Sequence, residues 1–358
     1  MKKIKILQVI DSLNVGGAEV LAVNIANSFS KSVDYNVSLC VTRKEGPLKK
    51  DINTNVDYNF LKKKSPVDLE FLIKLYRLIK KNNIKIIHAH NTSYFSCVLV
   101  NFLFFNRKKL IWHNHSGGYI SLSGSKLKIL KFCSSYFNTI INVNEELNNW
   151  SEKTLRCKKN IVLNNFASFL NNDEITNLKG VEGKRIVCLA GLRPIKNHEY
   201  LVNAFEIILK KHPDWTLHLI GKYYEDEYYN SIIKLISNKK LEKCIFLYGL
   251  RRDIKNILKQ SNIGVLTSKK EGLPISLLEY GLAKLPVVLT DTCNTANLII
   301  DEAIAPSNDF TVFSKKIIEV IENSSLRIKI SNILYSNISD NFSEEYFISE
   351  LKNTYIKL

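Results

Sequence analysis

The chain has 358 residues and a formal net charge of +17, with 51 Lys and Arg residues against 34 Asp and Glu residues. This length exceeds one typical hydrophobic core and predicts two domains. Apolar residues make up 45% of the sequence, an ordinary share for a globular protein, and no apolar run approaches the ~20 residues that span a bilayer.

The start of the chain and its cysteines predict a cytoplasmic protein. Residues 1–10 begin Met-Lys-Lys and turn apolar, but Asp11 ends this run without the small-residue pattern of a signal-peptide cleavage site. The seven cysteines are scattered, with no metal-ligand spacing and no disulfide framework. We interpret them as buried thiols in a reducing compartment.

Short apolar segments alternate with longer amphipathic segments along the first half of the chain. The strand candidates are residues 4–10, 37–41, 84–88, 110–112 and 140–143. The helix candidates are residues 18–30, 68–81, 92–105 and 125–137. This alternation is typical of parallel α/β construction.

A polar stretch, residues 168–184, is interpreted as a linker to a second alternation of the same kind. Its strand candidates are residues 185–190, 216–220, 244–247, 263–266 and 287–289. Its helix candidates are residues 199–211, 228–237, 254–259 and 275–282. The sequence therefore predicts two doubly wound α/β domains, residues 1–167 and 185–341, with a final helix over residues 342–358.

The most informative motif is Glu271-Gly-Leu-Pro-Ile-Ser-Leu-Leu-Glu279. Gly272 and Pro274 predict a tight turn, and the helix then starts at Ile275. The free N–H groups and positive dipole end of a helix N-terminus suit a diphosphate, and ionised carboxylates on either side accept hydrogen bonds from hydroxyls. The alternative is an ordinary amphipathic helix with solvated glutamates.

A basic turn follows the strand predicted over residues 185–190. Arg193 and Lys196 are close enough in this turn to converge on one anion. Arginine offers a planar fork to phosphate oxygens and lysine offers a point charge. A helix-capping turn with solvated charges is the alternative.

A glycine pair, Gly16 and Gly17, follows the first predicted strand and opens a helix. Without side chains, the backbone N–H groups there can approach a phosphate or an acceptor. The run is not Gly-x-Gly-x-x-Gly, so a dinucleotide-binding oxidoreductase is disfavoured.

Two histidine pairs, His88 with His90 and His113 with His115, each end a predicted strand. The pairs come from different strands and no carboxylate flanks them at ligand spacing, which argues against a metal site. Histidines that are buried and hydrogen-bonded for structural reasons are the alternative to a ligand-binding role.

Glu-x7-Glu followed by Tyr280-Gly-Leu-Ala-Lys-Leu-Pro-Val-Val288 resembles the signature of the retaining, nucleotide-sugar-dependent glycosyltransferases of family 4. That family has the GT-B architecture, in which two Rossmann-like domains face each other across a cleft and the C-terminal helix returns to the first domain. The resemblance is strong over residues 185–306 and patchier before residue 165.

The resemblance implies roles for individual residues. It places His115, with His113 as the rival, beside the transferred sugar, and it makes Glu271, Arg193 and Lys196 the other catalytic groups. It implies a donor site at Gly16, Gly17, Arg193, Lys196, Asn197, Tyr248, Gly249, Asp253, Ser268, Glu271, Gly272, Leu273, Pro274, Ile275 and Glu279.

The activity that the resemblance implies is transfer of a hexose or N-acetylhexosamine from a nucleoside diphosphate, with UDP as the expected carrier, to a sugar acceptor. The configuration of the donor is retained, and neither a metal nor a cofactor is expected. The rivals are a nucleotide-sugar epimerase of the same fold, which needs no acceptor, and a basic peripheral scaffold without catalysis.

The positive charge has two explanations. Lys, Asn and Ile are abundant throughout, as a compositional bias of the genome would produce. The other is an anionic partner: no nucleic-acid motif is found, whereas residues 71–81 and 127–133 mix lysines with large apolar residues at roughly helical spacing. Together with what the resemblance to family 4 implies, this favours a protein on the inner face of the membrane and a lipid-linked acceptor, as in capsule, exopolysaccharide or lipopolysaccharide assembly.

Overall fold

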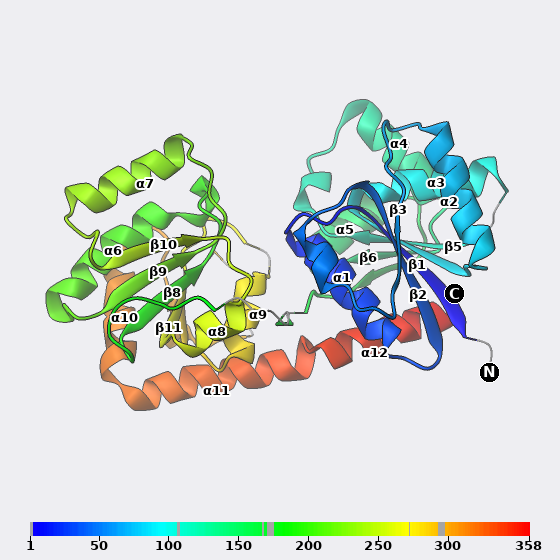
Figure 1. Ribbon diagram of the computed structural model, residues 1–358. Coiled ribbons are helices and arrows are strands. Elements are labelled where there is room, and N and C mark those ends of the chain that lie inside the picture. The colour runs from blue at the N-terminus through cyan, green and yellow to red at the C-terminus, as the bar shows by residue number, and fades with distance from the viewer. Residues whose placement is uncertain (1–2, 106–107, 167, 170–174, 272, 293–297) are drawn as a thin grey trace. The chain divides into compact units, whose positions relative to one another are not determined.

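The computed structural model describes residues 3–105, 108–166, 168–169, 175–271, 273–292 and 298–358. The chain divides into two compact units, which we call unit 1 (residues 1–165 and 345–358) and unit 2 (residues 166–344). The final helix α12 (Glu344–Ile356), red in Figure 1, thus contributes to unit 1 although it follows unit 2 in the sequence. Residues 170–174 of the predicted linker and Gly272 lie outside the described residues.

The described strands of unit 1 form a seven-stranded parallel sheet in the order β3-β2-β1-β4-β5-β6-β7. They are β1 (Ile4–Ser12), β2 (Tyr35–Lys44), β3 (Asp57–Phe60), β4 (Ile86–His90), β5 (Lys109–Asn114), β6 (Thr139–Asn142) and β7 (Asn160–Val162). The direction in which successive strands are added reverses between β1 and β4. Open α/β sheets bind ligands beyond the carboxyl ends of the strands at such a switch point.

Helices connect the strands of unit 1. They are α1 (Gly17–Ser30), α2 (Leu69–Lys81), α3 (Tyr94–Leu103), α4 (Gly124–Ser134) and α5 (Glu145–Thr154), with short 3-10 turns η1 (Pro47–Asp51), η2 (Asn91–Ser93) and η3 (Gly117–Tyr119). The Asp68 carboxylate caps α2 by accepting the N–H of Phe71 at 3.0 Å, and Asn144 caps α5 by accepting the N–H of Leu147 at 2.8 Å. Each cap satisfies a donor that the first helical turn leaves free.

The two faces of the unit 1 sheet differ because successive side chains of a strand point in opposite directions. Leu7 and Val9 of β1 belong to the apolar core that α2, α3 and α4 complete on one side (Figure 1). Gln8 points to the other side, where its amide donates to the Tyr355 hydroxyl of α12 at 3.1 Å. The ring of Phe29 in α1 lies 5.3 Å from the ring of Tyr355. The face beneath α1 and α12 therefore buries polar side chains.

Unit 2 repeats the construction, and its described strands form a six-stranded parallel sheet in the order β10-β9-β8-β11-β12-β13. They are β8 (Arg185–Leu189), β9 (Thr216–Ile220), β10 (Ile245–Gly249), β11 (Ile263–Leu266), β12 (Val287–Thr290) and β13 (Ile304–Ala305). The switch point of this sheet lies between β8 and β11.

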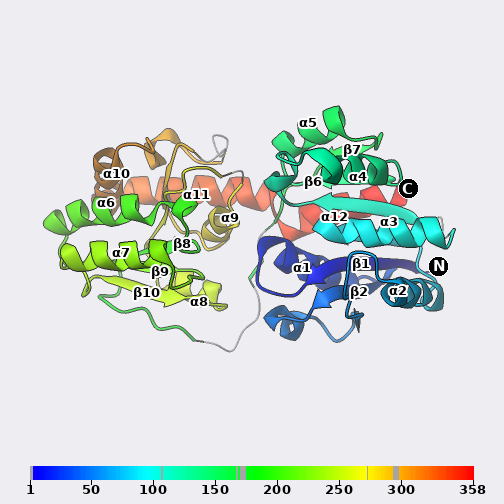
Figure 2. The same ribbon diagram turned by 90° about the horizontal axis from the view of Figure 1, so that it is seen from above.

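The helices of unit 2 cover its sheet, and Figure 2 shows α6 and α7 side by side. They are α6 (His198–Lys211), α7 (Glu227–Asn238), α8 (Ile254–Lys259), α9 (Ile275–Leu282), α10 (Phe310–Glu322) and α11 (Ser324–Asn341), with 3-10 turns η4 (Pro194–Lys196) and η5 (Asp301–Ala303). Helix α9 begins at the residue that the turn chemistry predicted, so Glu279 lies about one turn inside it.

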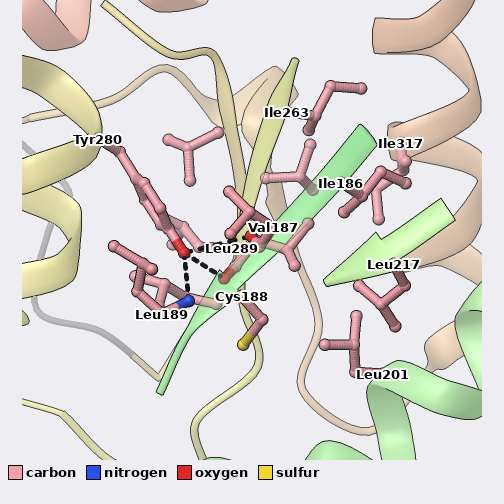
Figure 3. Close-up of a cluster of buried hydrophobic side chains, with 14 of the residues drawn as sticks. Ile186, Val187, Cys188, Leu189, Leu201, Leu217, Ile263, Tyr280, Leu289 and Ile317 are labelled. Carbon is pink, nitrogen blue, oxygen red and sulfur yellow. Dashed lines mark hydrogen bonds between the residues drawn. The ribbon is translucent and has the colours of Figure 1, made fainter. Parts of the chain in front are cut away.

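Tyr280 fixes α9 on the sheet of unit 2. Its fully buried hydroxyl accepts the N–H of Leu189 at 2.7 Å and lies 3.2 Å and 3.3 Å from the carbonyl oxygens of Val187 and Val265, to which it donates (Figure 3). The ring packs directly on Gly264 of β11, where a Cβ atom would lie 2.9 Å from it. One side chain thus links α9 to both strands of the switch point.

The predicted α/β class with two Rossmann-like units is confirmed, and some elements differ. The edge strands β3 and β7 escaped prediction because they are short and their side chains are partly exposed, so neither shows a long apolar run. The predicted strand 244–247 extends to Gly249, because a register shift after Leu247 and a positive φ of 70° at Gly249 let the strand continue. Helices α5, α10 and α11 and strand β13 were also not predicted.

Replacing Tyr280 by Phe tests the anchoring of α9. We expect a loss of about 1–3 kcal/mol in the free energy of unfolding, because the buried N–H of Leu189 loses its acceptor. Urea unfolding of the full chain measures it. Tyr224→Phe, on an exposed tyrosine, is the control and should leave the midpoint unchanged. Equal midpoints for both variants would contradict the anchoring role.

Candidate functional site

The switch point of unit 2 brings together two loops that lie far apart in the sequence. The loop after β8 carries Lys196, and the loop after β11 carries Ser268 and Glu271. The Lys196 ammonium forms an ion pair with Glu271 Oε1, and the Ser268 hydroxyl donates to the same oxygen at 2.8 Å. The charged side chains are only 18% and 17% exposed, so solvent screens this pair less than a surface ion pair.

Hydrogen bonds to main-chain carbonyls hold the two loops in register. The N–H of Lys269 donates to the carbonyl of Ile195 at 2.8 Å, and the Thr267 hydroxyl donates to the carbonyl of Lys196 at 3.0 Å. Asn197 ends the η4 turn with φ 56° and ψ 48°, a left-handed conformation that asparagine tolerates better than most residues. The position of Lys196 is therefore set by backbone contacts on both sides.

Arg193 lies at the start of the η4 turn, and its side chain is exposed. A Cβ atom at Gly191 would lie 3.7 Å from its Nε, an ordinary van der Waals contact, so the guanidinium lies close to the backbone at Gly191. Within the described part of the chain, no carboxylate lies within ion-pair distance of Arg193. Its N–H donors are available to an anion at the same switch point as Lys196.

The N-terminus of α9 lies next to this ion pair in the sequence. Pro274 occupies the position before the helix and no side chain caps it, so the first N–H groups of α9 have no partner within the helix. Leu273 packs against the core of unit 2, and Ile275 begins the helix. Burial raises the pKa of Glu279 to about 7, so a neutral form of this carboxyl is populated near neutral pH.

The segment around β10 supports the fold through its side chains. Both carboxylate oxygens of Asp253 accept hydrogen bonds from Thr176, from the N–H at 2.6 Å and from the hydroxyl at 2.9 Å. The Tyr248 hydroxyl accepts the N–H of Lys179 at 3.0 Å and lies 3.1 Å from His218 Nδ1. A ligand contact in this segment would therefore come from the main chain, including that of Gly249.

The glycine loop of unit 1 meets a carboxylate of its own chain. Gly16 precedes α1 and Gly17 begins it, and a Cβ atom at Gly16 would collide with the side chain of Glu19. Burial raises the pKa of the Glu19 carboxyl, and the nearby Asp11 raises it further. The N-terminus of α1 therefore already has an acidic side chain beside it.

Four histidines lie together on the face of the unit 1 sheet beneath α12. Strand alternation directs His88 and His90 of β4 and His113 of β5 to this face, and His115 follows two residues later. The rings of His113 and His115 are stacked with centroids 4.0 Å apart, and the ring of His113 lies 6.3 Å from Phe347 of α12.

These imidazoles belong to a hydrogen-bonded chain of six side chains, which we call the histidine relay. In order it comprises His115, His90, Gln8, Tyr355, His88 and His113. The successive separations between donor and acceptor atoms are 2.9, 2.7, 3.1, 2.7 and 3.2 Å. At its two ends, His115 Nδ1 and His113 Nε2 are covered and have no hydrogen-bond partner among the described residues.

The relay fits a neutral hydrogen-bond network better than a metal centre. Nitrogen atoms of His88, His90 and His113 lie within 4.8 Å of one another, a spacing that a metal ion could bridge. Both ring nitrogens of His88 and His90 are already engaged by other side chains. Burial lowers the pKa of His88 and of His115 to about 3, so both rings are neutral at physiological pH.

A pocket in unit 1 is lined by residues that directly follow two members of the relay in the sequence. It measures about 340 Å³ and is lined by Asn91, Thr92, Ser116, Gly118, Tyr119 and Leu122. Asn91 directly follows His90, and Ser116 directly follows His115. This volume falls in the range of small-molecule sites, and the lining combines hydroxyl and amide groups with an aromatic ring.

The fold agrees with the comparison to known families. The chain matches the model described as Glycosyltransferase Family 4 over residues 15–165 and the model described as Glycosyl transferases group 1 over residues 171–336. These two matches correspond to units 1 and 2. The chain therefore belongs to the family 4 glycosyltransferases.

Relatives of this chain are glycosyltransferases over most of its length. An uncharacterized glycosyltransferase of Haemophilus influenzae is 25% identical, with 94% of each chain covered. The UDP-Gal:alpha-D-GlcNAc-diphosphoundecaprenol alpha-1,3-galactosyltransferase of Escherichia coli is 24% identical over 81% of this chain and 80% of that protein. The solved Anabaena protein HepE, in complex with UDP and glucose, superposes with a TM-score of 0.81 at 17% identity, covering 99% and 100% of the chains. At this identity the superposition establishes a shared fold.

The sequence missed two members of the relay, Gln8 and Tyr355. The sequence carried a signal for Gln8, because this polar residue interrupts the apolar residues Ile6, Leu7, Val9 and Ile10 of the first strand. Its side chain is fully buried. Tyr355 had no local signal, since a tyrosine in an amphipathic helix is common and its partners lie far away in the sequence.

The raised pKa of Glu279 predicts a glutamate that titrates near neutrality in the free protein. In ¹³C-carboxyl-labelled protein, one glutamate resonance should titrate with a midpoint of about pH 7 and disappear in Glu279→Gln. The carboxyl is protonated below this midpoint and ionised above it, because burial penalises the charged form. Glu345→Gln, on an exposed glutamate of α12, should remove a different resonance. A Glu279 midpoint at the ordinary value of about 4.3 would contradict the assignment.

Proposed function

We propose that this protein is a retaining, metal-independent glycosyltransferase that moves a hexose or N-acetylhexosamine from UDP to a sugar acceptor. The observation that carries the proposal is the Lys196–Glu271 pair at the switch point of unit 2, beside the uncapped N-terminus of α9. Lys196, Arg193 and the helix N-terminus suit a diphosphate, and Glu271 and Glu279 suit hydroxyls.

In the proposed reaction, the bond between the anomeric carbon and the diphosphate oxygen breaks while the acceptor oxygen bonds to the same face of that carbon. The acceptor proton passes to the departing diphosphate oxygen, so atoms and charge balance. Lys196 and Arg193 stabilise the negative charge that develops on the leaving group, the role that a metal ion fills in other transferases. Lys196 must exchange Glu271 for the phosphate, which frees the carboxylate for hydroxyls of the sugar.

Support for the donor and the acceptor comes from the relatives. The E. coli relative is named for UDP-Gal and for an acceptor linked to diphosphoundecaprenol, and the HepE structure contains UDP. We therefore propose a UDP-sugar donor and a lipid-linked sugar acceptor in cell-surface polysaccharide biosynthesis. The pocket lined by Asn91, Thr92 and Ser116 is the proposed place for a sugar ring in unit 1.

Nucleotide binding without metal tests the donor site. In a thermal-shift panel of nucleoside diphosphates with EDTA, UDP should raise the melting temperature, because a ligand that binds the folded state stabilises it. Lys196→Ala should weaken UDP binding by about ten- to hundredfold, since it removes a charge-assisted contact to phosphate. Lys211→Ala, which also removes one lysine of an ion pair, is the matched control.

The outcomes separate the rival functions. No stabilisation by any nucleotide would contradict the transferase proposal and favour a non-catalytic scaffold. Conversion of the donor to an epimer in the absence of any acceptor would favour the epimerase. Transfer with inversion at the anomeric carbon, measured by NMR of the product, would contradict the retaining mechanism.

A further inference from the structure

The positive charge of this chain is concentrated in one stretch of unit 1. Residues 71–144 contain nine Lys and two Arg residues and neither Asp nor Glu, whereas the whole chain carries 34 acidic residues. A compositional bias would spread lysine throughout but would not remove every carboxylate from this segment. The segregation therefore indicates a surface that meets an anion.

The same stretch exposes a cluster of large apolar side chains, which we call the aromatic patch. It comprises the exposed side chains of Phe102, Leu103, Phe105, Ile129 and Phe132 and the half-buried ring of Tyr136. The Tyr136 ring lies 6.0 Å from the ring of Phe102 in α3 and 5.4 Å from the ring of Phe132 in α4, so the patch bridges two helices. Phe105 is 84% exposed. Exposed aromatic clusters of this kind mark interaction sites.

Lysines flank the aromatic patch. Lys126, Lys128 and Lys131 belong to α4 and alternate with its exposed apolar side chains. Lys108 lies between Phe105 and Ile129 of the patch in the sequence, and burial together with the neighbouring charges of Lys85 and Lys80 lowers the pKa of its ammonium. Aromatic side chains beside clustered lysines are the composition of protein surfaces that insert into the interface of an anionic bilayer.

We propose that the aromatic patch and its flanking lysines dock unit 1 on an anionic lipid bilayer. Within the described chain no helix has the length and apolar content to cross a membrane, so the contact is an interfacial one. The docking proposal rests on the proposed function in one respect, which is the purpose of docking: to bring the enzyme to a lipid-linked acceptor. Docking itself requires neither nucleotide nor acceptor.

Sedimentation with vesicles tests the docking surface. Binding to phosphatidylglycerol vesicles should exceed binding to phosphatidylcholine vesicles and weaken as salt is raised to about 0.5 M. Phe102→Ser with Phe132→Ser should weaken it by about tenfold or more, and Lys126→Gln with Lys128→Gln should weaken it at low salt only. Ile328→Ser, on an exposed apolar residue of α11 in unit 2, is the control.

Several results would overturn the docking proposal. Equal binding to neutral vesicles, or no effect of the aromatic substitutions, would do so. A dimer in solution that Phe102→Ser with Phe132→Ser dissociates would assign the patch to a second copy instead. A soluble acidic polysaccharide could bind with the same affinity as the vesicles, and the aromatic substitutions could leave that affinity unchanged. This result would assign the lysines to a glycan. None of these outcomes depends on whether the protein transfers a sugar.

A second inference follows from counting protons along the histidine relay, where each neutral imidazole has one donor and one acceptor nitrogen. The Gln8 carbonyl oxygen only accepts, so His90 carries its proton on Nε2. His90 Nδ1 must then accept, and His115 donates to it from Nε2. His115 Nδ1 is left as a bare acceptor.

The other arm of the relay follows from the amide group of Gln8. Its N–H donates to the Tyr355 hydroxyl, which therefore directs its own proton to His88 Nδ1. His88 donates from Nε2 to His113 Nδ1, which leaves a proton on His113 Nε2. A Gln8 amide turned by 180° would reverse every donor and acceptor, so one side chain sets the polarity of the whole relay.

We propose that Gln8 and Tyr355 are positioning residues that fix His115 as its Nε2–H tautomer, so that Nδ1 accepts a hydrogen bond from a hydroxyl of the bound sugar. The covered Nδ1 without a partner among the described residues supports this role, and the residue that follows His115, Ser116, lines a pocket. His115 then acts as a neutral acceptor and not as an acid. The sugar in this statement rests on the proposed function, whereas the tautomer does not.

¹⁵N NMR of histidine-labelled, ligand-free protein tests the tautomer directly. The wild-type His115, assigned with His115→Gln, should show a protonated Nε2 and a bare Nδ1. Gln8→Leu should give His115 a mixture of tautomers, and Tyr355→Phe should lower kcat/KM at unchanged UDP affinity. His212→Gln, on a histidine of unit 2 outside the relay, is the spectral control.

Three results would overturn the relay. The first is a wild-type His115 that is protonated on Nδ1. The second is a His115 tautomer that Gln8→Leu leaves unchanged. The third is a set of ¹⁵N chemical shifts typical of metal-bound imidazole for His88, His90 and His113, with stoichiometric metal in the purified protein. The last result would make the cluster a metal site. The wild-type spectrum alone shows which nitrogen of His115 is protonated, so this part of the test does not require that Gln8→Leu or Tyr355→Phe folds.

Discussion

The hydroxyl of Tyr280 is the contact on which the candidate donor site depends. It joins α9 to β8 and β11, the two strands whose carboxyl ends form the switch point of unit 2. The loops after these strands carry Lys196 and Glu271, and α9 carries Glu279. A tyrosine serves here because its ring fills apolar volume while its polar tip reaches buried backbone groups, which otherwise lose hydrogen bonds on burial.

In unit 1, by contrast, imidazole rings and an amide are buried under a helix. A buried polar network is stable only when its members satisfy one another, since each unpaired group in a low-dielectric interior is costly. Tyr355 of α12 supplies the link between the two arms of the histidine relay. The last helix of the chain therefore completes the polar face of the first sheet. Among the described residues, only the two outer nitrogens of the relay are left unpaired, and one of them belongs to His115, whose neighbour in the sequence, Ser116, lines the pocket.

Charge and apolar surface are combined in the same part of unit 1. Lysines and exposed apolar side chains alternate on α4, and residues 71–144, which include α3, α4 and α2 from Phe71 onward, contain neither Asp nor Glu. The opposite side of the same sheet carries the histidine relay beneath α12. One layer of strands thus separates a surface suited to lipid headgroups from a face suited to polar chemistry, and strand alternation produces both.

The sequence alone determined the α/β class, the two Rossmann-like units, the start of α9 and the grouping of basic and acidic residues after strands. These features are local, because turn residues, helix caps and apolar periodicity act over a few neighbouring positions. The pairing of Lys196 with Glu271, the relay through Gln8 and Tyr355 and the patch that joins Phe102 to Phe132 were decided by tertiary structure. Each depends on which strands are neighbours and which face of an element is covered, and residues far apart in the sequence carry no local signal of that arrangement.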